Sequence, residues 1–209
     1  MISCGSDALC LERRRVNVSA AYFLSIEFQA TGGLLNSLYC VSFERRPLYS
    51  EFVPDAAIVG QNLIVGKTGW EGVLEANKQA FVNAWVQRAA FANAYGALGN
   101  DAYVDTLINH TGVGFTLNER NALVNSLVNQ TATRAQVVRQ IAEDPRFVRL
   151  KFNETFVMME YFGYLRRDPD AGGFQFWLDK LNQFNGNFEQ ADMVKAFIVS
   201  GEYRARFPQ

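Results

Sequence analysis

The stretch of residues 161–181 constrains the fold of this chain more than any other part of its sequence. It reads YFGYLRRDPDAGGFQFWLDKL, so an apolar segment, a charged turn and a second apolar segment follow one another without a gap. Apolar residues at helical spacing favour a helix, whereas a run rich in Asp, Pro and Gly interrupts it. The stretch therefore predicts two helices joined by a short loop.

The helix that leads into this loop is expected to lie at the centre of the protein. It spans residues 146–165, and between Glu154 and Arg166 its only charged residue is Glu160. A helix without a polar side should be buried on most of its faces. The helix after the loop, residues 171–183, is amphipathic instead. Its buried stripe is expected to contain Phe174, Trp177, Leu178 and Leu181.

Helical spacing recurs along most of the chain, which predicts an all-α fold. Residues 47–69 differ, because they carry two prolines and three glycines beside short β-branched segments. We expect an extended connector there, with room for a small hairpin. Thr116 and Glu119 have the spacing of a capping box at the start of one helix. The expected helices cover residues 6–28 (one helix or a broken pair), 34–43, 70–95 (the longest), 100–109, 116–128, 133–144, 146–165, 171–183 and 187–198, with a short helical turn at 200–202.

Parts of the chain resemble one another, which is typical of proteins built from repeated units. The segment AYFLSIEF at residues 21–28 matches AFIVSGEY at residues 196–203, with Ala, Ser and Glu identical. A weaker third copy, IAEDPRF, lies at residues 141–147. Short apolar helices also resemble each other by chance, so that alternative stays open.

The repeat divides the chain into four segments. Residues 1–46 hold the C-terminal half of a truncated first unit and the helix after it, and residues 47–69 form the connector. Residues 70–150 form a degenerate unit, and residues 151–209 form the best-matching unit. We expect the units to pack as an orthogonal or bundle-like array of helices. The first half of the leading unit would come from preceding chain or from another copy of this one.

Charge and hydropathy argue against two kinds of partner. A formal net charge of −1 over 209 residues is unlike that of a general nucleic-acid binder, which needs concentrated Lys and Arg. No run reaches the roughly 20 apolar residues that a membrane-spanning helix requires, so membrane insertion is not expected. The sequence shows no basic start followed by an apolar stretch, and hence no visible signal peptide.

Three cysteines are distributed unevenly along the chain. Cys4 and Cys10 are close enough in sequence to close a small loop, whereas Cys40 stands apart in an apolar context. Two states fit this spacing: a disulfide between Cys4 and Cys10, or three reduced thiols in a cytosolic protein. With one histidine and no second cysteine pair, a zinc site is not expected.

The loop at residues 166–173, RRDPDAGG, is the strongest candidate for a binding site. Asp168 and Asp170 with a later glycine match the start of a calcium-binding loop, so calcium is the one cofactor that the sequence suggests. The residue at the closing position of such a loop, Asp179, falls in the next helix instead. A structural turn explains the same residues, with Asp170 capping the next helix and Arg166 paired to Asp170. The residues assigned to this turn are Arg166, Pro169, Asp170, Gly173 and Trp177.

No catalytic constellation is recognisable in the sequence. His110 is the only histidine, has no serine or cysteine nucleophile motif nearby, and is expected to be exposed or to end a helix. Glu160 is expected to be paired with Arg166 or Arg167 rather than to act as a general base. An enzyme that uses Glu160, Asp170 or His110 is therefore the least favoured hypothesis.

Two segments, YLRRDPDAGGFQFWLDKL and MVKAFIVSGEYRARF, resemble the bacterial family of domains of unknown function numbered 4214. The N-terminal segment is similar to the second half of another copy, in a variant with the cysteine pair, so about two and a half copies are expected. The middle unit departs from the family, with Tyr103 in place of the tryptophan and no Arg-x-Pro-Asp turn. The residues that carry the resemblance are Tyr161 or Tyr164, Leu165, Arg166, Pro169, Asp170, Gly173, Phe174, Trp177, Ser200, Glu202 and Tyr203.

The resemblance implies an all-helical module, similar in pattern to the helical linker domains of phycobilisomes, within secreted or surface-associated bacterial proteins. We therefore expect a non-catalytic structural or interaction module that binds protein or glycan partners or associates with itself. A calcium-dependent binding module that uses Asp168 and Asp170 is the alternative.

Overall fold

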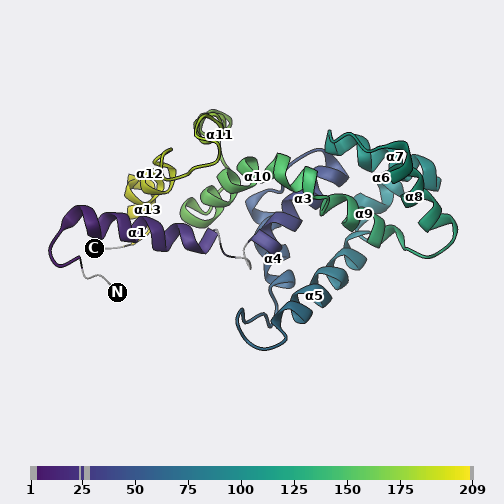
Figure 1. Cartoon of the computed structure of the whole chain (residues 1–209), viewed down its shortest axis with the longest axis horizontal. Helices are drawn as coiled ribbons and strands as arrows, with labels where there is room; N and C mark the ends of the chain where they lie inside the picture. Colours follow the sequence, from purple (N-terminus) through teal and green to yellow (C-terminus); the bar gives the residue numbers. More distant parts are fainter. Residues whose placement is uncertain (1–3, 24, 26–28, 208–209) are drawn as a thin grey trace. The chain divides into compact units, whose positions relative to one another are not determined.

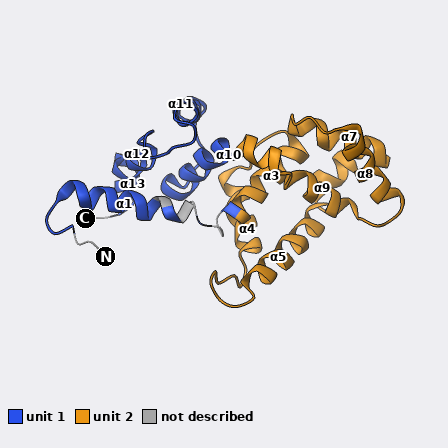
Figure 2. Ribbon diagram, in the orientation of Figure 1, with its two compact units in different colours: residues 1–29, 152–209 blue, residues 30–151 orange. Residues whose placement is uncertain are grey.

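The computed structural model describes residues 4–23, 25 and 29–207, and this part of the chain is all α-helical, without a β-strand (Figure 1). Contacts divide the chain into two compact units. Unit 1 combines residues 1–29 with residues 152–209, and unit 2 comprises residues 30–151 (Figure 2). This division differs from the four segments drawn from the sequence, because the helix at residues 34–43 packs inside unit 2. Of the expected repeat at residues 21–28, residues 24 and 26–28 lie outside the described part.

Unit 2 is built around α3, which is buried along nearly its whole length. α3 packs against α4, α7 and α9, while α5 contacts α4 and α9, and α8 contacts α7 and α9. Before α3, a short π-helical turn, η1 (Gln29–Gly33), leads into the unit. The helices are α3 (Leu34–Phe43), α4 (Tyr49–Val59), α5 (Trp70–Trp85), α6 (Ala89–Tyr95), α7 (Asn100–Thr111), α8 (Leu117–Val128), α9 (Arg134–Ala142) and the first part of α10 (Pro145–Glu160).

Two buried aromatic residues are tied to the end of α3 by hydrogen bonds. Trp85 donates from Nε1 to the Ser42 hydroxyl at 3.0 Å, and the Tyr95 hydroxyl donates to the Ser42 carbonyl oxygen at 2.7 Å. Both rings are almost completely buried. Because their polar atoms are satisfied, these large side chains can fill the core without the cost of a lost hydrogen bond.

The single long helix expected over residues 70–95 is wrong, because the chain breaks between α5 and α6 at residues 86–88. Arg88 has an extended backbone, with φ −61° and ψ 139°. Its guanidinium reaches α4 and meets the carboxylate of Asp55 at 2.6 and 2.9 Å. Asp55 is only 5% exposed. A buried carboxylate needs such a two-point cationic partner, and this requirement overrides the local preference for a continuous helix.

The extended connector expected at residues 47–69 is also wrong in its first half, which forms α4, and no hairpin occurs there. The start of α4 is held by Glu51, which accepts from the Leu48 backbone N–H at 2.8 Å. Arg45 holds the same carboxylate with contacts of 2.7 and 2.8 Å. Pro54 lies inside the helix and removes one backbone hydrogen bond. The burial of Phe52 and Asp55 on the same helix compensates for that loss.

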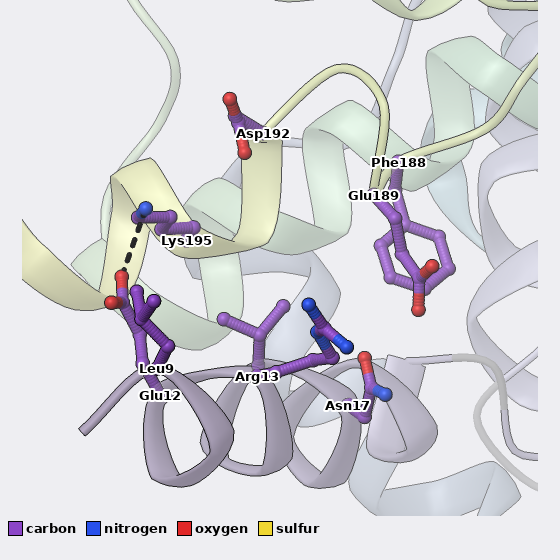
Figure 3. Close-up of a pocket in the computed structure, with 9 residues that line it drawn as sticks. Leu9, Glu12, Arg13, Asn17, Phe188, Glu189, Asp192 and Lys195 are labelled. Atoms are coloured by element: carbon purple, nitrogen blue, oxygen red, sulfur yellow. Dashed lines mark ion pairs between the residues drawn. The ribbon is translucent and has the colours of Figure 1, made fainter. Parts of the chain in front are cut away.

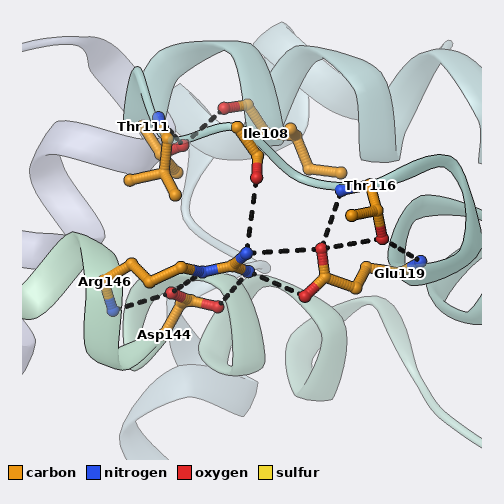
Figure 4. Close-up of polar contacts among 8 residues, drawn as sticks. Ile108, Thr111, Thr116, Glu119, Asp144 and Arg146 are labelled. Carbon is orange, nitrogen blue, oxygen red and sulfur yellow. Dashed lines mark hydrogen bonds and ion pairs between the residues drawn. The ribbon is translucent and has the colours of Figure 1, made fainter.

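A polar network in unit 2 joins the loop before α8 to the start of α10 (Figure 4). Arg146 contacts Asp144 at 2.8 Å and Glu119 at 3.1 Å, and it donates to the Gly114 carbonyl oxygen at 3.3 Å. Glu119 also closes the capping box with Thr116 that the sequence predicted. Each charge in this network has a partner of opposite sign, so the network serves to hold the loop.

Unit 1 surrounds the second part of α10, which continues directly into the π-helical η2 (Tyr161–Leu165). Residues 155–162 are all buried, as expected for a helix without a polar side. α12 contacts α1, α13 and η2. The other helices of the unit are α1 (Ala8–Phe23), α11 (Ala171–Gln183), α12 (Met193–Val199) and α13 (Gly201–Arg204).

The helix expected at residues 187–198 begins later than predicted. Asn187 does act as a cap, since its side chain accepts from the Gln190 N–H at 3.0 Å, but it caps only a turn. Asp192 has a left-handed backbone, with φ 52°, and α12 begins after it at Met193. A left-handed residue cannot continue a right-handed helix, so the turn and α12 stay separate.

The turn between α3 and α4 in unit 2 and the turn between η2 and α11 in unit 1 have the same local geometry. Each helix ends at a left-handed residue, with φ 53° in unit 2 and φ 55° in unit 1. In each turn the following arginine lies over a tyrosine ring, at 5.0 Å in unit 2 and 5.3 Å in unit 1. The corresponding residues are Tyr39 and Tyr161, Glu44 and Arg166, Arg45 and Arg167, Pro47 and Pro169, and Phe52 and Phe174.

Candidate interaction surface

α1 in unit 1 is weakly covered by the rest of its unit. None of its residues with a described side chain is buried, and Leu9 and Val18 are 73% and 75% exposed. The sequence explains this, because the charged run from Glu12 to Arg15 fills more than one helical turn and leaves no continuous apolar stripe to bury.

The start of α1 is held by a disulfide and by a capping side chain. The structure joins Cys4 to Cys10, with their Cα atoms 5.6 Å apart. Asp7 accepts hydrogen bonds from the backbone N–H groups of Leu9 and Cys10 at 3.0 and 3.2 Å. Cys40, in α3, is a buried free thiol. The small N-terminal loop therefore fixes the first turn of a helix that has little burial of its own.

An ion pair links α1 to α12 and separates two hollows in the surface. The Lys195 ammonium lies 3.0 Å from the Glu12 carboxylate. On one side of this pair is a cavity of about 300 Å³, which we call the mixed-charge cavity (Figure 3). Its lining combines cationic and acidic groups, so its charges largely compensate one another. The lining residues are Leu9, Glu12, Arg13, Val16, Asn17, Phe188, Glu189, Asp192 and Lys195.

On the other side of the Glu12–Lys195 pair lies a cationic hollow, which we call the arginine groove. It consists of two adjoining cavities of about 500 and 520 Å³ that share Leu11, Arg15 and Ile198. Apart from Glu12 and Lys195, which pair with each other, every charged residue that lines the groove is an arginine. Its members are Ala8, Leu11, Glu12, Arg14, Arg15, Val16, Val18 and Ser19 of α1, together with Lys195, Ile198, Val199, Tyr203 and Arg204.

The turn at residues 166–173 is a capped structural turn, as predicted. The arginine that lies near Asp170 differs from the predicted one. Asp170 caps α11 by accepting from the Gly173 N–H at 2.7 Å, and this hydrogen bond lowers the pKa of the Asp170 carboxyl. The cation near Asp170 is Arg167, at 3.6 Å, and not the expected Arg166. Arg166 is the left-handed residue that ends η2, so its exposed side chain points elsewhere. Arg167 also pairs with Glu202 of α13 at 2.6 Å.

The described residues hold no cluster of three acidic, histidine or cysteine side chains that would bind a metal ion. Asp170 is occupied with the end of α11. Asp179, at the closing position of the calcium-loop pattern, accepts from Gln175 on its own helix at 2.7 Å. Asp168 is exposed, and its carbonyl oxygen accepts from Arg167 at 2.9 Å.

α11 presents an aromatic surface made of Phe176 and Trp177, of which only Trp177 was expected to be buried. Phe174 and Leu181 are buried as predicted, but Trp177 is only partly covered, against Phe197 at 5.6 Å. Phe176 is 57% exposed and meets the Trp177 ring at 5.0 Å. α11 therefore buries a narrower stripe than its sequence period predicts.

The residues considered for catalysis lie apart along the chain, with Glu160 and Asp170 in unit 1 and His110 in unit 2. The expected pairing of Glu160 with Arg166 or Arg167 is wrong. Both of its carboxylate oxygens are buried and lack a hydrogen-bond partner in the described part of the chain. Burial raises the pKa of this carboxyl well above its ordinary value. His110 lies in the last turn of α7, where Nδ1 is 2.8 Å from the Val41 carbonyl oxygen, a contact that joins α7 to α3.

Neither hollow beside α1 was identified from the sequence. In sequence, Arg13, Arg14 and Arg15 have the pattern of a solvated helix face, and a single helix cannot show which face meets a neighbour. The available signal was the period of Leu11, Arg15 and Val18, which places an arginine within an apolar row. The opposite wall comes from residues far along the chain, which helical periodicity does not connect to α1.

Fold and surface together define a class of protein: an all-α module of packed short helices with an open, partly apolar groove on one unit. The family described as "Domain of unknown function (DUF4214)" matches residues 149–207, in the C-terminal part of the chain. This finding confirms the resemblance drawn from the motif. Neither a curated protein nor a solved structure matches the chain. No helix in the described part is both long enough and apolar enough to span a membrane.

Proposed function

We propose that this chain is a non-catalytic structural or interaction module of a secreted or surface-associated bacterial protein, which binds protein or glycan partners. The observation that supports this function is the open surface along α1. Apolar side chains such as Leu9 and Val18 stay exposed there, beside recessed cavities. Exposed apolar groups next to hollows are typical of interaction sites.

The disulfide between Cys4 and Cys10 supports the proposed location. Disulfides persist in oxidising compartments such as the bacterial periplasm and the cell surface, and are rare in the cytosol. Removing either cysteine would free the loop that precedes α1. The expected consequence is a less ordered α1 and a weaker interaction surface.

The two kinds of partner favour different places on unit 1. A protein partner fits the groove between α1 and α12, because it is long and has apolar walls. A glycan fits α11, where the exposed ring of Phe176 lies beside Trp177 and the polar side chains of Gln175 and Asp179. Aromatic faces offer apolar area with few rotatable bonds, and neighbouring polar groups can bond to hydroxyls.

The proposal is tested by the purified chain in two binding assays. Light scattering gives the mass in solution with and without added partner, and biolayer interferometry measures binding to immobilised bacterial cell-wall glycans and envelope proteins. If Phe176→Ser weakens binding, the partner is a glycan on α11. If Leu11→Ser with Val18→Ser weakens binding, the partner is a protein in the groove beside α1. A folded monomer that binds none of these components contradicts the proposed function.

A further inference from the structure

The arginine groove gathers three arginines around one hollow. Arg14, Arg15 and Arg204 are exposed, and none contacts a carboxylate among the described residues. Unpaired guanidinium groups gathered around one hollow are available to an anionic partner. The arginines that do form ion pairs with described acids are Arg45, Arg88, Arg120, Arg139, Arg146 and Arg167.

The shape of the groove is that of a trough along a helix. Leu11, Arg15 and Ile198 line both of its cavities, so the two are continuous. Along α1 the trough runs from Ala8 to Ser19, which at a rise of 1.5 Å per residue is roughly 16 Å. That length accommodates about three turns of a second helix.

The walls of the groove combine apolar area with charge on both sides. α1 contributes Leu11 and Val18 to one wall, and α12 contributes Ile198 and Val199 to the other. The charges are also divided between the walls, with Arg14 and Arg15 on α1 and Arg204 on α13. A ligand that fits must be apolar along its middle and acidic along both flanks.

We propose that the arginine groove binds an acidic amphipathic helix of a partner protein. Apolar side chains of that helix at positions i, i+3 or i+4, and i+7 lie between α1 and α12. Carboxylates on its flanks meet Arg14 and Arg15 on one side and Arg204 on the other, where a guanidinium and a carboxylate form two parallel hydrogen bonds. The inference rests on the proposed function and adds the chemical class of the partner.

The geometry favours a helix over a lipid surface. Ile198 and Tyr203 line the trough and are only partly exposed, so a protruding side chain reaches them more readily than a flat bilayer surface does. Membrane-binding helices instead present a protruding apolar face with a cationic border.

The test uses the full chain and a synthetic probe. The probe is a fluorescein-labelled peptide of about 16 residues, roughly four helical turns, with leucines at i, i+3, i+4 and i+7 and glutamates on both flanks. Fluorescence anisotropy gives its affinity for the chain. We expect saturable binding that weakens with added sodium chloride, and no binding of a second probe in which lysines replace the glutamates.

Charge reversal in the groove locates the site, with a matched control on the same helix. Arg15→Glu should weaken probe binding by about tenfold, and Arg15→Glu combined with Arg204→Glu should weaken it further. Arg13→Glu introduces the same charge next to Arg14 but faces the mixed-charge cavity, so the affinity should stay within about twofold of the wild-type value. Leu11→Gln removes apolar wall area without a change in charge and should also weaken binding. Circular dichroism serves as the control that each variant keeps its helical content.

Three results would overturn the inference. The first is a wild-type chain that does not bind the glutamate probe. The second is an equal loss of affinity in Arg13→Glu and in the groove variants. The third is binding to phosphatidylserine vesicles, with the arginine dependence predicted for the peptide, when the peptide itself does not bind. If the chain captures a glycan or an envelope protein but not the acidic probe, the groove assignment fails and the proposed function stands.

Discussion

Arg167 and Glu202 form a two-point ion pair between the turn after η2 and the short helix α13. The guanidinium Nε and Nη2 atoms lie 2.6 and 3.0 Å from the two carboxylate oxygens. Arg167 also covers the Tyr161 ring at 5.3 Å. One arginine therefore connects both segments that carry the DUF4214 resemblance, which lie far apart in the sequence.

Breaking this pair should cost little stability, because both side chains are substantially exposed, at 40% and 46%. Exposed pairs contribute about 0.2–1 kcal/mol, so Glu202→Ala should lower the free energy of unfolding by about 0.5 kcal/mol. Arg167→Ala also removes the contact with Tyr161 and should cost about 1–1.5 kcal/mol. Urea unfolding of the two single variants and the double variant gives the coupling energy. Arg204→Ala, on the same short helix, is the control and should have almost no effect.

The pair also predicts a pH dependence. The Arg167 guanidinium lowers the pKa of the Glu202 carboxyl below its ordinary value. The folded state therefore binds this proton less tightly than the unfolded state, and the stabilisation is present above the unfolded pKa of about 4.3. It should disappear as the pH falls through the folded-state pKa, and the coupling energy should shrink with it. A coupling energy that is constant down to acidic pH contradicts an ionic origin.

Gly173 should not tolerate a methyl group, whereas its neighbour should. A Cβ at Gly173 would lie against the Tyr161 hydroxyl and within 2.9 and 3.0 Å of the Asp170 carboxylate oxygens. Gly173→Ala should therefore destabilise the protein by about 1–3 kcal/mol through overpacking. At Gly172 the nearest atom is 3.8 Å away, so Gly172→Ala should be neutral or gain up to about 0.5–1 kcal/mol of helix propensity. Equal effects on urea unfolding would contradict this account of the turn.

Calcium should not bind at the Asp168–Asp170 turn. Asp170 is engaged by the Gly173 N–H and lies close to Arg167, and Asp179 is bonded to Gln175. Isothermal titration with calcium chloride should give no saturable heat, and the melting temperature should not change. Asp170→Ala should lower the melting temperature equally with and without calcium, because it removes a helix cap. A calcium-dependent rise in melting temperature that Asp168→Ala abolishes would favour the calcium-dependent alternative.

Glu160 should make the protein less stable as the pH rises above the acidic range. Burial raises the pKa of its carboxyl, so the folded state binds the proton more tightly than the unfolded state. This group therefore contributes no penalty below the unfolded pKa, and a growing one as the pH rises toward the folded-state pKa. Glu160→Met removes a buried polar group and should stabilise the chain by about 1–3 kcal/mol at neutral pH.

A comparison with an exposed glutamate tests whether burial causes the pH-dependent effect of Glu160 on stability. Glu160→Met should stabilise the protein more at pH 8 than at pH 4, whereas Glu189→Met, at an exposed position, should show no such trend. Chemical denaturation at the two pH values measures both. If Glu160→Met is destabilising at neutral pH, then the carboxylate is engaged with a group that supports the fold.

Local features of the sequence predicted the turn that organises unit 1. Asp170 precedes an apolar stripe, and α11 begins and ends where that pattern does. The capping box of Thr116 and Glu119 was also recognisable, because both partners lie within one helical turn. These features depend on atoms close together along the chain, so sequence reasoning could find them.

Features that depend on distant partners were missed. The break before α6 follows from Arg88 meeting Asp55 on another helix, and Pro54 suggested a connector although its segment is helical. The expected partner of Glu160 was chosen by nearness in sequence, whereas its oxygens are buried without a hydrogen-bond partner among the described residues. In each case, contacts with residues distant in sequence outweighed the local sequence preference on which the prediction was based.

The amino-acid sequence by itself determined the helical class, most of the helices, and the capped turn at residues 166–173, since hydrophobic period, caps and turn residues act within a few positions. Only the tertiary structure decided that residues 1–29 pack with residues 152–209, and that α1 and α12 form the walls of one groove. Burial depends on which surfaces meet in space, and periodicity along one helix specifies a face without specifying the neighbour that covers it.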